Sequence, residues 1–216
     1  ELVIRNILPQ VDRINIYLND YDTIPQFLQH PKINAVLSKD ADGDLRDNGK
    51  FYFLHEIEEG YHIMVDDDIN YPENYIATLI LKIEQYGRNA IVGSHGVILD
   101  NPVTRFFQNR TVYNFIKSLD RDCFVNLLGT GTVCYHTSTI SMQDFSAKHT
   151  GMADVYLALM ARQQKVPMVC IQRPSGWMSE INHGGGTLWE EFKIDDKKQT
   201  KLVKAVDNWH SVEYSN

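Results

Sequence analysis

The sequence predicts an α/β domain of three layers, in which helices cover both faces of a mostly parallel central sheet. Apolar runs of strand length alternate with stretches of helical periodicity along most of the chain. Residues that favour turns separate these stretches, and 216 residues suit a single domain. Because sheets of this class bind ligands beyond the carboxyl ends of their strands, we expect the functional site there.

The first third of the chain is expected to hold a helix, two strands and a long loop. Residues 1–10 have the character of a helix, and apolar and polar residues alternate at 14–18 as in a strand. Segment 38–50 is rich in Asp and Gly, which predicts a loop whose length indicates function. A short helix is expected within 51–60, before an apolar run at 61–65 that predicts a buried strand.

The rest of the chain continues this alternation. A helix is predicted after Pro72, because apolar residues recur there at spacings of three and four. The pattern at 90–99 is typical of a strand, and 126–136 is typical of a strand with a glycine-interrupted approach. Helical spacing at 153–164 predicts another helix, which a strand at 166–172 follows.

Composition narrows the classes of function. A net charge of −7 argues against a general nucleic-acid-binding protein, which needs a broad basic surface. No apolar run approaches the roughly 20 residues that span a bilayer. Cys123, Cys134 and Cys170 are far apart in apolar surroundings, so we expect reduced core cysteines and a cytoplasmic setting.

Three consecutive carboxylates, Asp66, Asp67 and Asp68, follow the apolar run at 61–65. Adjacent carboxylates repel one another unless a cation neutralises them, and oxygen ligands favour Mg²⁺ or Mn²⁺. A solvated acidic turn is the alternative, but the buried strand before the aspartates and the helix after them favour a metal site. Such an ion would bind a diphosphate leaving group, with Lys50 and Arg173 as candidate cations beside it unless they are ordinary surface charges.

Two glycine-rich stretches and one aspartate complete the candidate site. Gly129, Thr130 and Gly131 allow close approach of the backbone to a ligand, although a simple turn gives the same pattern. The run 183–186, between Trp177 and a second tryptophan at 189, predicts either a flap that closes over a polar substrate or a plain exposed loop.

Asp154 begins a predicted helix, where a carboxylate serves as a cap or as a functional group. His62, His95, Cys134 and His136 lack metal-ligand spacing and an identifiable nucleophile partner, so we expect them to be structural.

Taken in order, the motifs resemble the bacterial heparosan-capsule N-acetylglucosaminyltransferases, and the resemblance covers nearly the whole chain. It is carried by QVDRINIYLND, DNGKFYF, VDDDINYPENY, IVGSHG, LLGTGTV, ADVYLALMARQQKVP, GWMSEI and LWEEF. The chain is also similar, more distantly, to the α-N-acetylhexosaminyltransferase domains of animal exostosin-like proteins. These share the DDD element, the later helix that begins with Asp, and the closing Trp segment.

The resemblance implies a GT-A fold, UDP-GlcNAc as donor, Mn²⁺ or Mg²⁺ as cofactor, and a glycan that ends in glucuronic acid as acceptor. The bond would be α1,4 and formed with retention. It also implies a capsule assembly complex at the inner face of the membrane, and a second glycosyltransferase domain or partner. An acidic protein needs local cations to admit a uronic acid, and the candidates are Arg105, Arg110 and Arg173.

The family motifs assign roles by position. Asp66 and Asp68 match the family's DxD carboxylates, with Asp68 as the direct metal ligand and Asp66 facing either the ribose or the metal. Asp154 matches the acidic residue beside the reacting sugar carbon. His183 is a third metal ligand only by analogy with other GT-A enzymes. The resemblance assigns donor binding to Gly49, Lys50, Asp66, Gly129, Thr130, Gly131, Arg173 and Trp177. Asp47 and Asp67, which neighbour these residues in the sequence, are also expected to bind the donor.

The family's first strand, with its Ser-Tyr-Pro-Pro-Arg-like turn, has no counterpart here. We therefore expect residues 1–216 to form one GT-A domain that lacks this strand and derives from a larger protein. Two alternatives stay open: a transferase for another UDP-sugar, and a catalytically silent module that binds a glycan or a partner within a larger polymerase.

Overall fold

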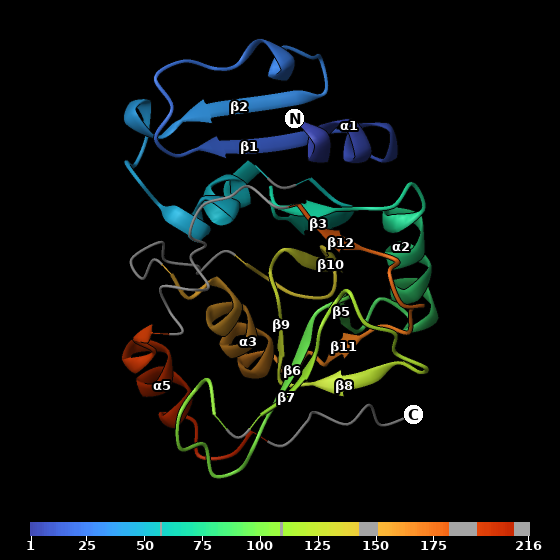
Figure 1. Ribbon diagram of the computed structural model, residues 1–216, viewed down its shortest axis with the longest axis vertical. Coiled ribbons are helices and arrows are strands. Elements are labelled where there is room, and N and C mark those ends of the chain that lie inside the picture. Colours follow the sequence, from blue (N-terminus) through green and yellow to red (C-terminus); the bar gives the residue numbers. More distant parts are fainter. Residues whose placement is uncertain (57, 109, 143–150, 182–193, 210–216) are drawn as a thin grey trace.

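The computed structural model describes residues 1–56, 58–108, 110–142, 151–181 and 194–209. Its strands form a five-stranded central sheet, a separate pair of strands at one end, and two smaller sheets (Figure 1). No helix among these residues is long and apolar enough to cross a membrane. The helices and strands together make this a protein of the mixed α/β class.

The central sheet has the order β3-β10-β5-β11-β8. Only β5 and β11 run parallel, whereas the other three neighbouring pairs are antiparallel, so the prediction of a mostly parallel sheet is wrong. A parallel pair needs a crossover connection, and the chain between β5 and β11 provides one that includes α3. The bounds are β3 Tyr61–Val65, β5 Ile91–Gly93, β8 Cys123–Val125, β10 Thr132–His136, β11 Met168–Cys170 and α3 Ala153–Gln163.

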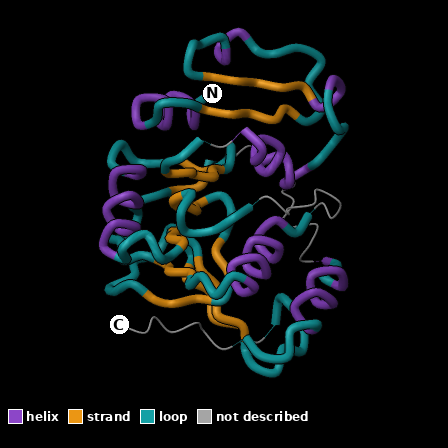
Figure 2. Tube along the Cα trace, turned by 180° about the vertical axis from the view of Figure 1, so that it is seen from behind, coloured by secondary structure: helices purple, strands orange, loops and turns teal. Residues whose placement is uncertain are grey.

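Helices pack on both faces of this sheet, as Figures 1 and 2 show from opposite sides. Val92 and Val169 belong to the core beneath α2 (Tyr75–Gln85), and Ile91 and Met168 belong to the core beneath α3. Alternate residues of a strand point to opposite faces, so each strand contributes to two apolar layers. The predicted helices after Pro72 and at 153–164 are confirmed, and the first one buries its apolar stripe at Ile76, Leu79 and Ile83.

The N-terminal region forms its own parallel pair of strands, β1 and β2, after the predicted first helix. The strand at 14–18 is confirmed, but β2 was not predicted. Segment 38–50, predicted to be a loop, contains two 3₁₀ helices instead, and the second of them continues through the expected helix after residue 51. The bounds are α1 Leu2–Ile7, η1 Leu8–Gln10, β1 Ile14–Leu18, η2 Gln26–Leu28, β2 Ile33–Leu37, η3 Ser38–Asp40 and η4 Arg46–Glu56.

Several short elements complete the molecule, and the sequence patterns missed most of them. The predicted strand at 90–99 is split into β5 and β6, which lie in different sheets. Cys134 and Cys170 are buried free thiols, as expected, whereas Cys123 is only partly buried. The remaining bounds are β4 Ile69–Asn70, β6 Gly96–Leu99, β7 Arg110–Tyr113, β9 Leu127–Leu128, β12 Ser179–Glu180 and α5 Lys197–Lys204.

Candidate functional site

Four segments that are distant in the sequence meet around the Lys50 ammonium group. Lys50 lies on η4, and its Nζ donates hydrogen bonds to the Asp66 carboxylate, just after β3, and to Thr130 Oγ1 at 3.3 Å. Thr130 belongs to the glycine-rich link between β9 and β10. Lys50 is therefore partly buried and held by predicted site residues, so the expectation of an ordinary surface charge does not apply to it.

Asp154 joins this group from the first turn of α3. Its Oδ1 accepts hydrogen bonds from the Thr130 backbone N at 2.7 Å and from Thr130 Oγ1 at 2.8 Å. Burial raises the pKa of Asp154, although the hydrogen bonds from Thr130 and the charge of Lys50 act in the opposite direction. The structure thus places Asp66, Lys50, Thr130 and Asp154 in one continuous network.

Gly131 lets the Asp66 carboxylate lie directly against the backbone. A Cβ atom at position 131 would stand 1.9 Å from Asp66 Oδ2 and 2.4 Å from its Cγ. No side chain other than hydrogen fits there without displacing the carboxylate. The glycine predicted for ligand approach therefore first accommodates another residue of the site.

Tyr71 is a buried member of the site that sequence reasoning missed. Its hydroxyl donates to the Gly131 carbonyl at 2.6 Å and accepts from the Asp66 backbone N at 2.8 Å. It therefore fixes the end of β3 against the start of β10. A tyrosine six residues after a strand end has no distinctive spacing, so no signal in the sequence identifies this role.

Asp47, predicted to bind the donor, caps α3 from a distant segment. Its Oδ1 accepts from the Gly151 backbone N at 2.5 Å, and its Oδ2 accepts from the Ala153 backbone N at 3.0 Å. These donors lie at the N-terminal end of the helix, where no turn of the helix can satisfy them. Asp47 thereby couples η4, which carries Lys50, to the helix turn that carries Asp154.

Replacement of Asp47 by Ala removes this cap and is expected to lower the free energy of unfolding by about 1–2 kcal/mol. The measurement is urea unfolding followed by circular dichroism. Asp40→Ala is the matched control, because Asp40 is exposed on η3. Equal stability of the two variants would contradict the capping role.

Negative charge dominates the site electrostatically. Burial raises the pKa of Asp68, and the neighbouring charges of Asp66 and Asp67 raise it further. Burial by itself would lower the pKa of Lys50, but Asp66, Asp154 and Asp47 raise it above the ordinary value. One lysine thus faces several carboxylates, an arrangement that favours binding of an additional cation.

The donor set fits a divalent ion that the substrate helps to ligate. Within the described residues, no three His, Cys, Asp or Glu side chains converge as a complete metal site. Mg²⁺ and Mn²⁺ commonly use one or two carboxylates and take substrate phosphates as further ligands, so Asp66 and Asp68 are the candidate protein ligands. His183, the run 183–186 and Trp189 lie outside the described residues.

Arg173 is placed differently from the prediction that it helps to bind a diphosphate. Its side chain is buried, and its guanidinium donates to the carbonyls of Phe115, Ile171, Tyr113 and Asn114, at distances from 2.8 to 3.3 Å. These bonds fix the segment after β7 to the end of β11. Sequence proximity to a strand end could not distinguish this structural role from a binding role.

Trp177 likewise has a partner within the protein. Its Nε1 donates to Asn74 Oδ1 at 3.1 Å, and its ring centroid lies 5.6 Å from that of Tyr75. It therefore packs at the start of α2.

The remaining predicted glycines differ in how closely they are packed. A Cβ at Gly49 would stand 2.9 Å from Tyr17 Cδ1, so this glycine allows η4 to approach β1. A Cβ at Gly129 would stand 3.3 Å from the His95 side chain, which is a milder contact.

His95, beside Gly129, has a lowered pKa of about 4, because its side chain is buried and because the positive charges of Arg110 and Arg173 disfavour a second proton. Its imidazole is therefore neutral at pH 7.

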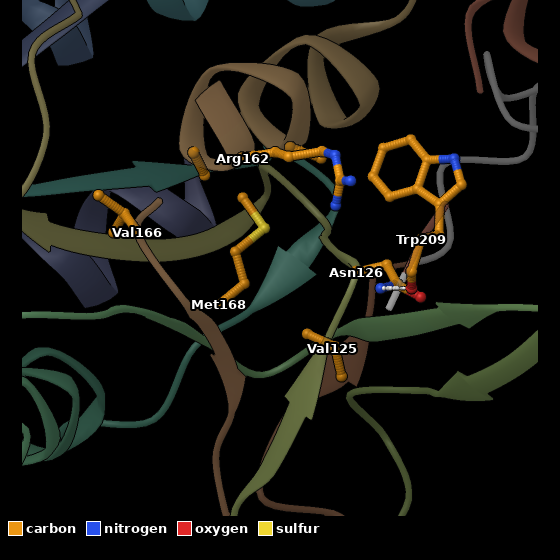
Figure 3. Close-up of a pocket in the computed structure, with 8 residues that line it drawn as sticks. Val125, Asn126, Arg162, Val166, Met168 and Trp209 are labelled. Atoms are coloured by element: carbon orange, nitrogen blue, oxygen red, sulfur yellow. Dashed lines mark hydrogen bonds between the residues drawn. The ribbon is translucent and has the colours of Figure 1, made fainter. Parts of the chain in front are cut away.

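A small cavity lies elsewhere, between α3 and Trp209 (Figure 3). Its volume of about 20 Å³ accommodates no more than a water molecule. Asn126 Nδ2 donates to the Trp209 carbonyl at 2.6 Å at its edge. This cavity is a packing feature and not a substrate site.

Comparison of the sequence with protein-family models and with curated proteins finds no match. Function is therefore inferred from the geometry of the site and from the sequence motifs.

Proposed function

We propose that this protein is a metal-dependent GT-A glycosyltransferase that moves N-acetylglucosamine from UDP-GlcNAc to a glycan ending in glucuronic acid, with retention. The observation that carries the proposal is the network of Asp66, Lys50, Thr130 and Asp154 just beyond β3. It joins Asp66, one of the two proposed metal ligands, with a cation suited to a phosphate. A second carboxylate, Asp154, is held in the same network by Thr130 and is the group that we expect beside the donor sugar.

The residues divide the work by charge. Asp66 and Asp68 would hold Mn²⁺ or Mg²⁺, which supplies electrostatic stabilisation of the departing diphosphate when bound. Lys50, whose side chain is partly buried, donates hydrogen bonds within the network and can share that negative charge. Its alternative partners, Asp66 and Thr130 Oγ1, keep the ammonium group oriented before substrate binds.

Asp154 is oriented by one oxygen and leaves the other available. Oδ1 accepts both hydrogen bonds from Thr130, while Oδ2 has no hydrogen-bond partner among the described residues. An oriented carboxylate can accept hydrogen bonds from sugar hydroxyl groups, or it can stabilise positive charge that develops on the sugar ring. Because Asp47 caps the same helix, the position of Asp154 depends on η4 as well.

The decisive experiment is a calorimetric titration with UDP in the presence of Mn²⁺ and, separately, of excess EDTA. We expect binding with Mn²⁺ and at least about 10-fold weaker binding without it, because Asp66 and Asp68 would hold an ion whose charge attracts the diphosphate. Asp68→Ala should bind UDP equally weakly under both conditions. A panel of UDP-sugars then identifies the donor by release of UDP in the presence of acceptor.

Two results would contradict the proposal. Absence of Mn²⁺-dependent UDP binding by the wild-type chain removes the transferase assignment. Full activity of Asp68→Ala removes the metal site. Efficient transfer from another UDP-sugar would keep the fold and the metal, and would replace only N-acetylglucosamine.

A further inference from the structure

Two of the three arginines that could serve an anionic acceptor are already engaged within the protein. Arg105 Nε donates to Asp196 Oδ1 at 2.8 Å, and the Asp196 side chain is only 3% exposed. Arg173 is buried with its donors on backbone carbonyls. Removing either side chain would leave buried acceptors unpaired, which identifies both as structural.

Arg110 differs from both, because its guanidinium makes no hydrogen bond or ion pair with any residue in the described part of the chain. It lies at the start of β7 and is only partly buried. Its guanidinium carbon stands 5.0 Å from the ring centroid of Phe106 and 4.4 Å from that of Phe107. These contacts support the planar group and leave its donors available.

A continuous set of contacts connects this arginine to the Asp154 end of the site. The Phe107 backbone N donates to Asp196 Oδ2 at 3.1 Å, just before α5. From α5, Gln199 Nε2 donates to the carbonyl of Gly151 at 3.2 Å, which is three residues before Asp154. Gln199 Oε1 is buried without a hydrogen-bond partner among the described residues.

The electrostatic interactions of Arg110 agree with a position near Asp154. Burial lowers the pKa of Arg110, and the carboxylates of Asp154 and Asp196 oppose that effect. Lys50, in contrast, interacts with Asp66, Asp154 and Asp47. The charge of Asp154 thus acts on both cations.

We propose that Arg110 is the acceptor-binding residue that receives the carboxylate of the terminal uronic acid, opposite the donor diphosphate across Asp154. This inference rests on the proposed function. Lys50 and the carboxylates of Asp66 and Asp68 serve the diphosphate, and the acceptor must approach the sugar from another side. A guanidinium with open donors is well suited to bidentate recognition of a carboxylate.

The test combines one substitution with one chemical change in the ligand. Wild type and Arg110→Gln are each titrated with a glucuronic-acid-ended oligosaccharide and with its methyl ester. We expect Arg110→Gln to weaken binding of the free acid roughly 10- to 100-fold, because a charge-assisted hydrogen bond is lost. Binding of the uncharged ester should change by no more than about twofold.

Two further variants serve as controls. Arg110→Lys should retain part of the preference for the acid, since it keeps the charge but not the fork of donors. Arg121→Gln, which removes an exposed arginine just before β8, should leave both affinities unchanged.

Equal weakening with acid and ester, or no weakening with either, would overturn the role of Arg110. A loss confined to UDP binding would also overturn it, because the arginine would then belong to the donor. Mn²⁺-dependent UDP binding is measured on the same samples. Its absence from the wild type refutes the transferase proposal, whereas a selective loss for the acid still establishes the carboxylate site.

Discussion

Gly131→Ala is expected to weaken Mn²⁺-dependent UDP binding roughly 10- to 100-fold while leaving the protein folded. The added Cβ would stand 1.9 Å from Asp66 Oδ2, so the carboxylate must leave its position and its contact with Lys50. The backbone at 131 does not have a positive φ, so alanine introduces a steric conflict and no backbone strain. Displaced ligands and their supporting contacts typically cost roughly 10- to 100-fold in metal affinity.

Gly129→Ala is the matched control for this substitution. It adds the same methyl group to the same link, but its nearest neighbours are His95 side-chain atoms at 3.3 Å, which can move slightly. Calorimetry with UDP and Mn²⁺, together with thermal unfolding of both variants, separates loss of binding from loss of fold. Unchanged UDP affinity of Gly131→Ala would show that the position of Asp66 is irrelevant to the nucleotide.

Asp154→Asn is expected to remove most of the transfer activity without impairing UDP binding. Asparagine keeps the shape and can still accept the Thr130 hydrogen bonds through its own Oδ1, but it lacks the negative charge that the proposed function requires beside the donor sugar. Removing one preorganised electrostatic contact commonly lowers kcat by roughly 10²- to 10³-fold. Steady-state kinetics and UDP calorimetry on the same preparation measure the two effects.

Asp120→Asn provides the comparison, because it makes the same chemical change at an exposed position before β8. Its kcat should equal that of the wild type. Were Asp154→Asn to retain wild-type kcat, the carboxylate would serve only to position Thr130. Were it to lose UDP binding as well, its role would lie in the architecture of the site.

The candidate site was predictable to the extent that it follows local patterns. The aspartates after an apolar run, the glycine-rich link and the helix-initiating Asp154 were all identified, and the structure brings Asp66, Lys50, Thr130 and Asp154 together. Tyr71 and the capping by Asp47 were not predictable. Their roles depend on partners 60 and more than 100 residues away, and sequence spacing carries no information about such contacts.

The roles of the arginines were predicted least well. The sequence does not distinguish a guanidinium that binds backbone carbonyls from one that binds a carboxylate or one whose donors stay available. Arg173 and Arg105 are engaged within the protein, and Arg110 is the one whose donors stay available within the described residues. Burial and the neighbouring hydrogen-bond acceptors determine which partner an arginine has, and both are properties of the folded chain.

By itself, the sequence determined the local elements with strong periodicity, such as β3 with its three following aspartates, α2, α3 and the buried strand β11. Hydrophobic period and turn residues act over a few neighbours, so they can be read directly. Only the tertiary structure decided strand order and direction, the placement of Lys50, and the need for glycine at position 131. Those features arise from contacts between distant segments, where one packing arrangement excludes the others.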